Sequence, residues 1–99
     1  MIIYEVNLKI SNDIYDNFHI WLQDHIKKVL SSSGFLDSKV YNVETDIVNY
    51  RLLSVHYYVK NIDSLNNYFI HHAPKLREEG LTLFSDRFSA KRRILSTLN

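Results

Sequence analysis

Cysteine is absent from the 99-residue sequence, so disulfides, thiolate nucleophiles and zinc sites with cysteine ligands are excluded. Glycine is scarce as well, and Gly34 and Gly80 stand too far apart to form a phosphate-binding glycine-rich loop. The Gly-x-Ser-x-Gly motif of serine hydrolases is also missing. The sequence therefore carries no signature of nucleophilic catalysis.

Strong charge and long apolar runs are lacking too. The formal net charge of +1 is too small to indicate nucleic acid or an anionic membrane as the main partner. No run of about 18 apolar residues occurs that would span a membrane. The opening residues Met1–Glu5 reach an acid at once and lack the basic start of a signal peptide. We expect a cytoplasmic protein with no nucleic-acid partner and no membrane partner.

What is present is the composition of a globular domain. Hydrophobic residues make up 45% of the chain, and its length suits one domain over residues 1–99. Apolar and polar residues alternate over 2–10, which predicts a half-buried strand. Residues 14–30 show helical spacing, with Phe18, Trp21, Leu22 and His25 on one stripe.

The second half of the chain repeats this order. Residues 35–44 and 50–60 read as a hairpin of two strands, and a second helix starts within 61–64. Pro74 disfavours helical geometry at Ala73, so this helix should break there and a short third helix should begin at the proline. Residues 88–95 close the chain as a strand.

The order β-α-β-β-α-β predicts an α+β, ferredoxin-like fold. We expect a four-stranded antiparallel sheet, two main helices on one face, and an extra short helix before the last strand. The other sheet face would carry a mixture of polar and apolar side chains, including Ile3, Tyr41, Leu52 and Tyr58. Such a face suits pairing with a second copy, which predicts a homodimer.

Four residues are candidates for a ligand site. His25 and His72 fall on apolar helix stripes expected to pack on the same sheet face, with His72 pointing to the core. Arg77 and Arg87 flank the third helix and suit a carboxylate or phosphate. The alternative is structural: buried histidines that bond the backbone, and arginines that pair with nearby acids. Whether Arg92 or Arg93 faces the helices is left open.

Two other site types fit poorly. A metal would need His25, His56, His72 and Glu5 to converge, but His56 is expected on the opposite side of the sheet. The third strand has aliphatic residues where an RNA-recognition strand needs stacking aromatics. We therefore expect no metal, no cofactor and no RNA.

Several motifs together resemble a known family. They are the opening Met-Ile-Ile-Tyr-Glu-Val-Asn, the Trp21 and His25 pair, Gly34-Phe35-Leu36, and the runs 72–78 and 84–88 with Arg92-Arg93. This set, which covers nearly the whole chain, is similar to the small bacterial family of domain of unknown function 4286 (DUF4286). Lys27 stands where that family is expected to have proline, and Gly80 interrupts a helical stretch. The resemblance implies a ferredoxin-like, dimeric α/β-barrel-type fold. It indicates no particular activity, because the family has none assigned.

Two hypotheses about function remain. The first is a homodimeric ferredoxin-like domain whose motifs are architectural. The second is a domain that binds a small anionic or aromatic molecule, or a cofactor-independent acid–base enzyme, with a pocket of His25, His72, Arg77 and Arg87. The sequence does not decide whether the protein is an enzyme.

Overall fold

The computed structural model describes residues 1–98. Its elements follow the predicted order, and the predicted strand ends lie within one residue of the observed ones. The elements are β1 (Ile2–Ser11), a 3₁₀ turn (Asn12–Ile14), α1 (Tyr15–Leu30), β2 (Phe35–Val43), β3 (Tyr50–Val59), α2 (Ile62–His71), α3 (Ala73–Phe84), a second 3₁₀ turn (Ser85–Arg87) and β4 (Phe88–Ser96).

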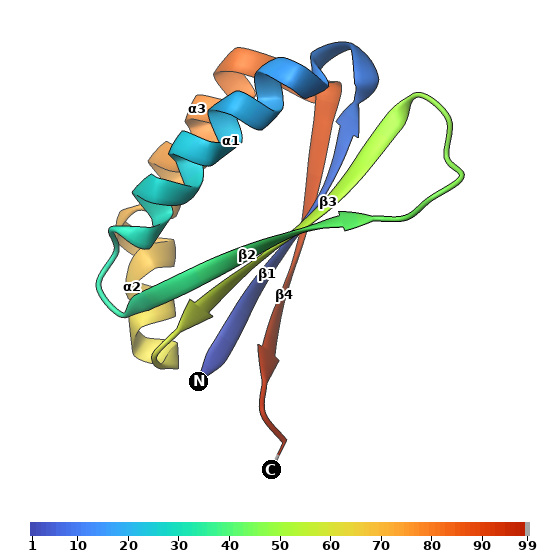
Figure 1. Cartoon of the computed structure of the whole chain (residues 1–99). Coiled ribbons are helices and arrows are strands. Elements are labelled where there is room, and N and C mark those ends of the chain that lie inside the picture. The colour runs from blue at the N-terminus through green and yellow to red at the C-terminus, as the bar shows by residue number, and fades with distance from the viewer. Residues whose placement is uncertain (99) are drawn as a thin grey trace.

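The strands form one antiparallel sheet in the order β2-β3-β1-β4. All three helices cover the same face of this sheet and leave the other face without helices (Figure 1). The ferredoxin-like arrangement predicted from the sequence is therefore confirmed. The extra helix predicted before the last strand is also present and runs for 12 residues, Ala73–Phe84.

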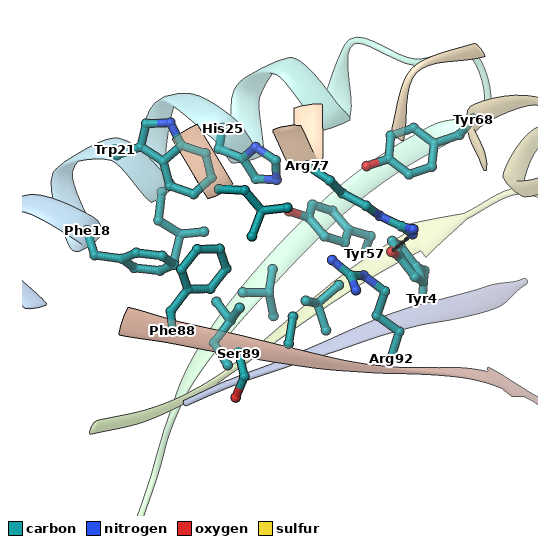
Figure 2. A pocket seen from close by; sticks show the side chains of 16 residues that line it. Tyr4, Phe18, Trp21, His25, Tyr57, Tyr68, Arg77, Phe88, Ser89 and Arg92 are labelled. Carbon is teal, nitrogen blue, oxygen red and sulfur yellow. Dashed lines mark hydrogen bonds between the residues drawn. The ribbon is translucent and has the colours of Figure 1, made fainter. Parts of the chain in front are cut away.

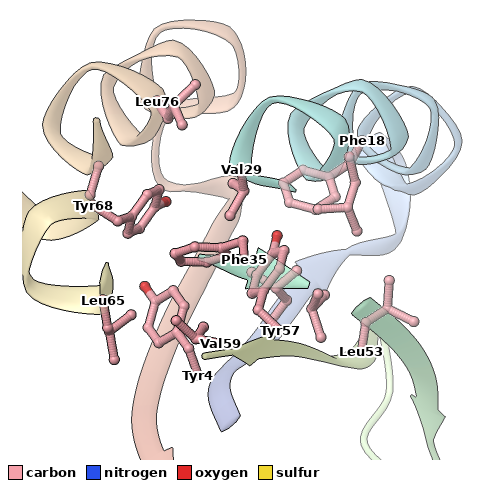
Figure 3. Packing of buried hydrophobic residues seen from close by; sticks show 14 of the residues in the cluster. Tyr4, Phe18, Val29, Phe35, Leu53, Tyr57, Val59, Leu65, Tyr68 and Leu76 are labelled. Carbon is pink, nitrogen blue, oxygen red and sulfur yellow. The ribbon is translucent and has the colours of Figure 1, made fainter. Parts of the chain in front are cut away.

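The core lies between the helices and the sheet. Alternate residues of β1 and β3, such as Tyr4, Leu8, Val55 and Tyr57, point to the helices and are buried. They meet the buried stripe of α1, represented by Phe18 and Val29 in Figure 3. Full burial of each such side chain contributes roughly 1.5–3 kcal/mol, so this layer is the main source of stability.

Two glycines lie where a side chain would not fit. Gly34 ends the turn after α1 with φ +84°, a left-handed conformation that favours glycine, and an added Cβ would collide with Ser64 Oγ. Gly80 lies within α3, where an added Cβ would be 2.9 Å from the Trp21 ring. α3 continues through Gly80 without a break, and the lack of a side chain there lets α3 approach α1 closely.

The break at Pro74 occurs as predicted, but the chain turns one residue earlier. His72 has φ −125°, which is not helical, and α3 begins at Ala73 with the proline in its first turn. Within residues 1–98, no helix is long and apolar enough to cross a membrane.

Candidate functional site

A cavity of about 200 Å³ lies between α1, α3 and the sheet (Figure 2). Leu81 and Arg92, which are exposed, mark where it reaches solvent. Aromatic and aliphatic side chains form most of its wall, with a few polar groups among them. The lining residues are Tyr4, Val6, Leu8, Phe18, Trp21, Leu22, His25, Val55, Tyr57, Tyr68, Arg77, Leu81, Phe88, Ser89, Ala90 and Arg92.

His25 enters this cavity from the middle of α1. Its ring stacks on Trp21 with centroids 4.6 Å apart and an interplanar angle of 26°. Burial is the main cause that lowers the pKa of His25 from 6.5 to about 4; Glu79 opposes this shift, and the nearby Lys28 and Arg92 charges contribute to it. The imidazole is therefore neutral at pH 7. Its Nδ1 is buried and has no hydrogen-bond partner among residues 1–98.

Arg77 reaches the cavity from the second turn of α3. One terminal nitrogen donates a hydrogen bond to the Tyr4 hydroxyl at 3.2 Å, and the guanidinium lies 5.9 Å from the Phe69 ring centroid. Its Nε is buried, again without a partner among the residues described. Arg92 extends into the same space from β4 (Figure 2). Two guanidinium groups thus face one cavity.

Tyr57 and Tyr68 beside the cavity do not ionise near neutral pH. Burial, with a contribution from the neighbouring Tyr4, raises the pKa of Tyr68 to about 12 against the opposing effect of Arg77 and Arg92. Burial also raises the pKa of Tyr57. Both hydroxyl groups therefore remain protonated. Neutral His25 is the side chain of this wall best suited to accept a proton.

The structure brings only two of the four predicted site residues together. His25 and Arg77 both line the cavity. His72 is exposed, so the expectation that it points to the core is wrong. The helical spacing that placed it on the buried stripe stops at His71, and Tyr68 fills the interior position instead.

Arg87 also lies outside the cavity. It pairs with Asp13 on the first 3₁₀ turn, and both side chains are about half exposed. The expected pocket of His25, His72, Arg77 and Arg87 is therefore not formed, because only His25 and Arg77 share a cavity. For Arg87, the structural alternative of an ion pair with an acid is the one observed, although its partner is distant in sequence.

Sequence reasoning missed Tyr4 and Arg92 as cavity residues. For Arg92 the missing information was the register of β4. Arg92 pairs with Val6, whose side chain faces the helices, whereas Arg93 pairs with Glu5 on the opposite face. The question left open by the sequence is thereby answered.

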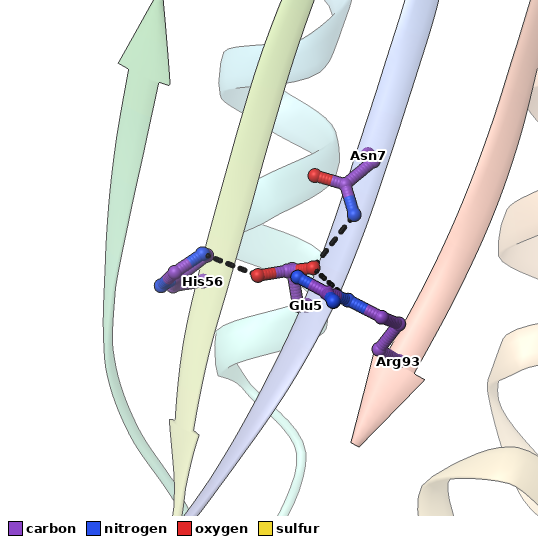
Figure 4. Close-up of polar contacts among 4 residues, drawn as sticks. All are labelled: Glu5, Asn7, His56 and Arg93. Atoms are coloured by element: carbon purple, nitrogen blue, oxygen red, sulfur yellow. Dashed lines mark hydrogen bonds and ion pairs between the residues drawn. The ribbon is translucent and has the colours of Figure 1, made fainter. Parts of the chain in front are cut away.

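The helix-free face carries a separate polar cluster around Glu5 (Figure 4). The Glu5 carboxylate accepts hydrogen bonds from Arg93 Nε and Asn7 Nδ2, both at 2.7 Å, and lies 3.0 Å from His56 Nε2. The bonds from Arg93 and Asn7 lower the pKa of Glu5 to about 2. Glu5 is only 4% exposed although no helix covers it, because these neighbours do. Residues 1–98 hold no group of three or more histidine, aspartate or glutamate side chains placed to bind a metal ion.

Comparison with known proteins supports the fold. SnoaB, a cofactor-independent oxygenase from Streptomyces nogalater, is 11% identical, with a TM-score of 0.70 over 99% of this chain and 94% of that one. A dimeric ferredoxin-like protein from an uncultured marine organism is 13% identical, with a TM-score of 0.72 over 99% and 95%. A conserved protein from Methanosarcina mazei Go1 is 19% identical, with a TM-score of 0.66 over 98% and 94%.

No curated protein matches the sequence. The family model described as domain of unknown function (DUF4286) matches residues 1–98, which is nearly the whole chain. These are the same residues that fold into the four-stranded sheet and its three covering helices. The chain therefore belongs to the DUF4286 family.

Proposed function

We propose that this protein binds a small aromatic molecule bearing an acidic oxygen in the cavity between its helices and its sheet. The observation that carries the proposal is the pair of buried nitrogens on the cavity wall, His25 Nδ1 and Arg77 Nε, which have no partner among residues 1–98. Buried polar groups are nearly always hydrogen-bonded, and leaving one unpaired costs about 1–3 kcal/mol. A ligand oxygen would supply the missing partner.

The size and wall of the cavity indicate the rest of the ligand. A volume of about 200 Å³ exceeds the roughly 150 Å³ of an apolar cavity known to take up benzene. Trp21, Phe18, Phe88 and Tyr57 offer ring faces and edges for an aromatic body. Arg77 and Arg92 suit a carboxylate or an ionised hydroxyl group. An aromatic acid matches both requirements.

The same arrangement supports acid–base chemistry once a ligand is bound. An anion held by Arg77 close to His25 would raise the pKa of the imidazole back toward its ordinary value. A histidine with a pKa near the working pH is an effective general base. The similarity to a cofactor-independent oxygenase concerns the fold alone and adds no chemistry to this proposal.

Trp21, the only tryptophan of the chain, makes binding measurable. Benzoate, which is transparent where tryptophan is excited, should quench Trp21 fluorescence saturably and raise the melting temperature. Benzyl alcohol, which lacks the charge, should bind at least about tenfold more weakly. Arg77→Gln should weaken benzoate binding by a similar factor, and Arg92→Gln tests the second guanidinium without disturbing a buried residue.

Arg87→Gln is the matched control, because it removes the same charge at a half-exposed position outside the cavity. It should bind benzoate as the wild type does. Absence of saturable quenching at millimolar benzoate, or equal affinity in the Arg77 and Arg87 variants, would refute the proposed site.

We further infer that two copies associate through the helix-free face of the sheet. That face carries partly covered apolar side chains, among them Ile3, Leu52 and Tyr58, and exposed Tyr41. It also holds the polar Glu5 cluster, in which the carboxylate already has hydrogen-bond partners within the chain and would not be left unpaired when covered. A similar structure is described as a dimeric ferredoxin-like protein, which supports this inference.

A further inference from the structure

A second hollow lies on the helix-free face, across the sheet from the cavity with His25, and Leu8 and Ser89 border both. It has a volume of about 350 Å³ and opens between one end of β1 and its neighbours β3 and β4. Strand register assigns its side chains to this face, because Lys9 pairs with Leu52 and Ser89, and Lys91 pairs with Asn7. Asn7 in turn lies beside Glu5 of the polar cluster.

The charge in this hollow is positive and unbalanced. Within residues 1–98, neither Lys9 nor Lys91 takes part in a salt bridge. Glu5, the buried acid of this face, is already bonded by Arg93, Asn7 and His56. The Lys9 ammonium lies 4.4 Å from the centroid of the Tyr50 ring, which holds it on this face of the sheet.

The remaining wall of the hollow is apolar. Val43, from the end of β2, and Leu52, opposite Lys9, contribute aliphatic surface next to the two ammonium groups. Glu44, the next acid along the chain, accepts a hydrogen bond from Asn42 and makes no ion pair with either lysine. A site with two cationic groups beside aliphatic surface suits an anion with an apolar body.

We propose that this hollow binds an amphipathic organic anion, with a carboxylate or phosphate head between Lys9 and Lys91 and its apolar part against Leu52 and Val43. The ligand differs from the one proposed for the other side of the sheet, since no aromatic ring other than Tyr50 adjoins these lysines. The two sites are separated by the sheet itself, so each can be tested alone.

If two copies associate as proposed above, anion binding in this hollow would affect their association. Covering the helix-free face would bury Lys9 and Lys91, and an unpaired buried ammonium is strongly unfavourable. A bound anion would neutralise this charge. Anion binding and association of two copies should therefore strengthen each other.

Octanoate is the probe for the site itself. In two-dimensional NMR of ¹⁵N-labelled protein, octanoate should saturably shift the amide signals of Asn7, Lys9, Leu52 and Lys91, which border this hollow and not the cavity with His25. The double variant Lys9→Gln with Lys91→Gln should bind octanoate at least about tenfold more weakly, because it removes the charge-assisted hydrogen bonds between the two ammonium groups and the carboxylate. Lys27→Gln with Lys75→Gln removes two exposed lysines of the helices and should leave affinity unchanged.

Four results would overturn the proposal. They are the absence of saturable shifts, shifts confined to the cavity around Trp21 and His25, equal affinity in the two double variants, and equally strong binding of octylammonium. Light scattering on the same samples separates the two proposals. If octanoate binds at this hollow while the protein stays monomeric, the site stands and the coupling to association fails.

Discussion

At the scale of single residues, two acid–base groups that differ strongly from solution behaviour lie on opposite sides of the sheet. His25 is held neutral by burial, whereas Glu5 is held ionised by Arg93 and Asn7. His25 Nδ1 has no hydrogen-bond partner among residues 1–98, whereas the two carboxylate oxygens of Glu5 are bonded by Arg93, Asn7 and His56. Unsatisfied groups point to a site and satisfied groups to structure, so His25 is the better candidate for function.

The lowered pKa of His25 makes stability depend on pH in a defined window. Between pH 6.5 and about 4 the unfolded chain binds a proton at His25 and the folded chain does not. Stability should therefore fall as the pH is lowered through this range, by up to about 1.4 kcal/mol per pH unit. Urea unfolding of the wild type and of His25→Phe, which keeps a ring against Trp21, measures this contribution.

The comparison is cleanest from pH 7 to pH 5. Below about pH 4.5 the lowered pKa of Glu5 adds a further loss of stability, because the unfolded chain then takes up a proton that folded Glu5 refuses. His19→Phe, an exposed change on the same helix, should retain the slope of the wild type. An equal slope in His25→Phe and the wild type would show that His25 titrates normally in the folded protein.

At the scale of elements, the sequence was sufficient for the strands and helices but not for the site. Period-two alternation in β1 placed Tyr4 on the core side, and the single proline marked the break between α2 and α3. Both are local signals. The position of His72 was predicted wrongly because a helical wheel holds only while the helix continues, and φ at His72 is no longer helical.

The cavity itself depends on contacts between elements that are distant in sequence. Arg77 meets Tyr4 across 73 positions, and Arg92 enters the cavity only through the register of β4 on β1. The one local signal of the close contact between α1 and α3 was Gly80 in a helical stretch. Its reason became visible only when the structure placed Trp21 against it.

Gly80→Ala should therefore distort the cavity. Alanine favours the helix by about 1 kcal/mol over glycine, but its Cβ would lie 2.9 Å from Trp21 and 3.4 Å from Phe88. Overpacking of this kind costs about 1–3 kcal/mol, so we expect a net loss of stability of about 1 kcal/mol. The Trp21 emission spectrum should shift and benzoate binding should weaken.

Thr82→Ala is the control for this change, because Thr82 is exposed on the same helix. The substitution raises helix propensity and adds no atom that could collide with a neighbour. It should be neutral or slightly stabilising and leave Trp21 emission unchanged. A stabilised Gly80→Ala protein with unaltered emission would mean that α3 has room for a side chain there.

At the scale of the whole molecule, the sheet separates two surfaces of different chemistry. The helix side encloses aromatic rings, a neutral histidine and two guanidinium groups. The open side presents a satisfied carboxylate cluster next to a basic hollow. The open side also exposes apolar side chains to water. Association with a second copy would cover them, and the Glu5 carboxylate would keep its partners.

Charge placed on the open face should therefore break the dimer. Ser54→Glu with Tyr58→Lys puts two new charges at the centre of the proposed seam, since Ser54 pairs with Asn7 and Tyr58 pairs with Ile3. We expect the dissociation constant to rise at least about a hundredfold, equivalent to roughly 2.7 kcal/mol. Ile20→Glu with Ile70→Lys introduces the same charges at exposed positions of α1 and α2 and should leave the dimer intact.

Light scattering at micromolar concentration measures the association of each variant, and circular dichroism confirms that each variant is folded. A monomeric wild-type protein under these conditions would refute the homodimer. A dimer that persists in Ser54→Glu with Tyr58→Lys but dissociates in Ile20→Glu with Ile70→Lys would show that the interface lies on the helices.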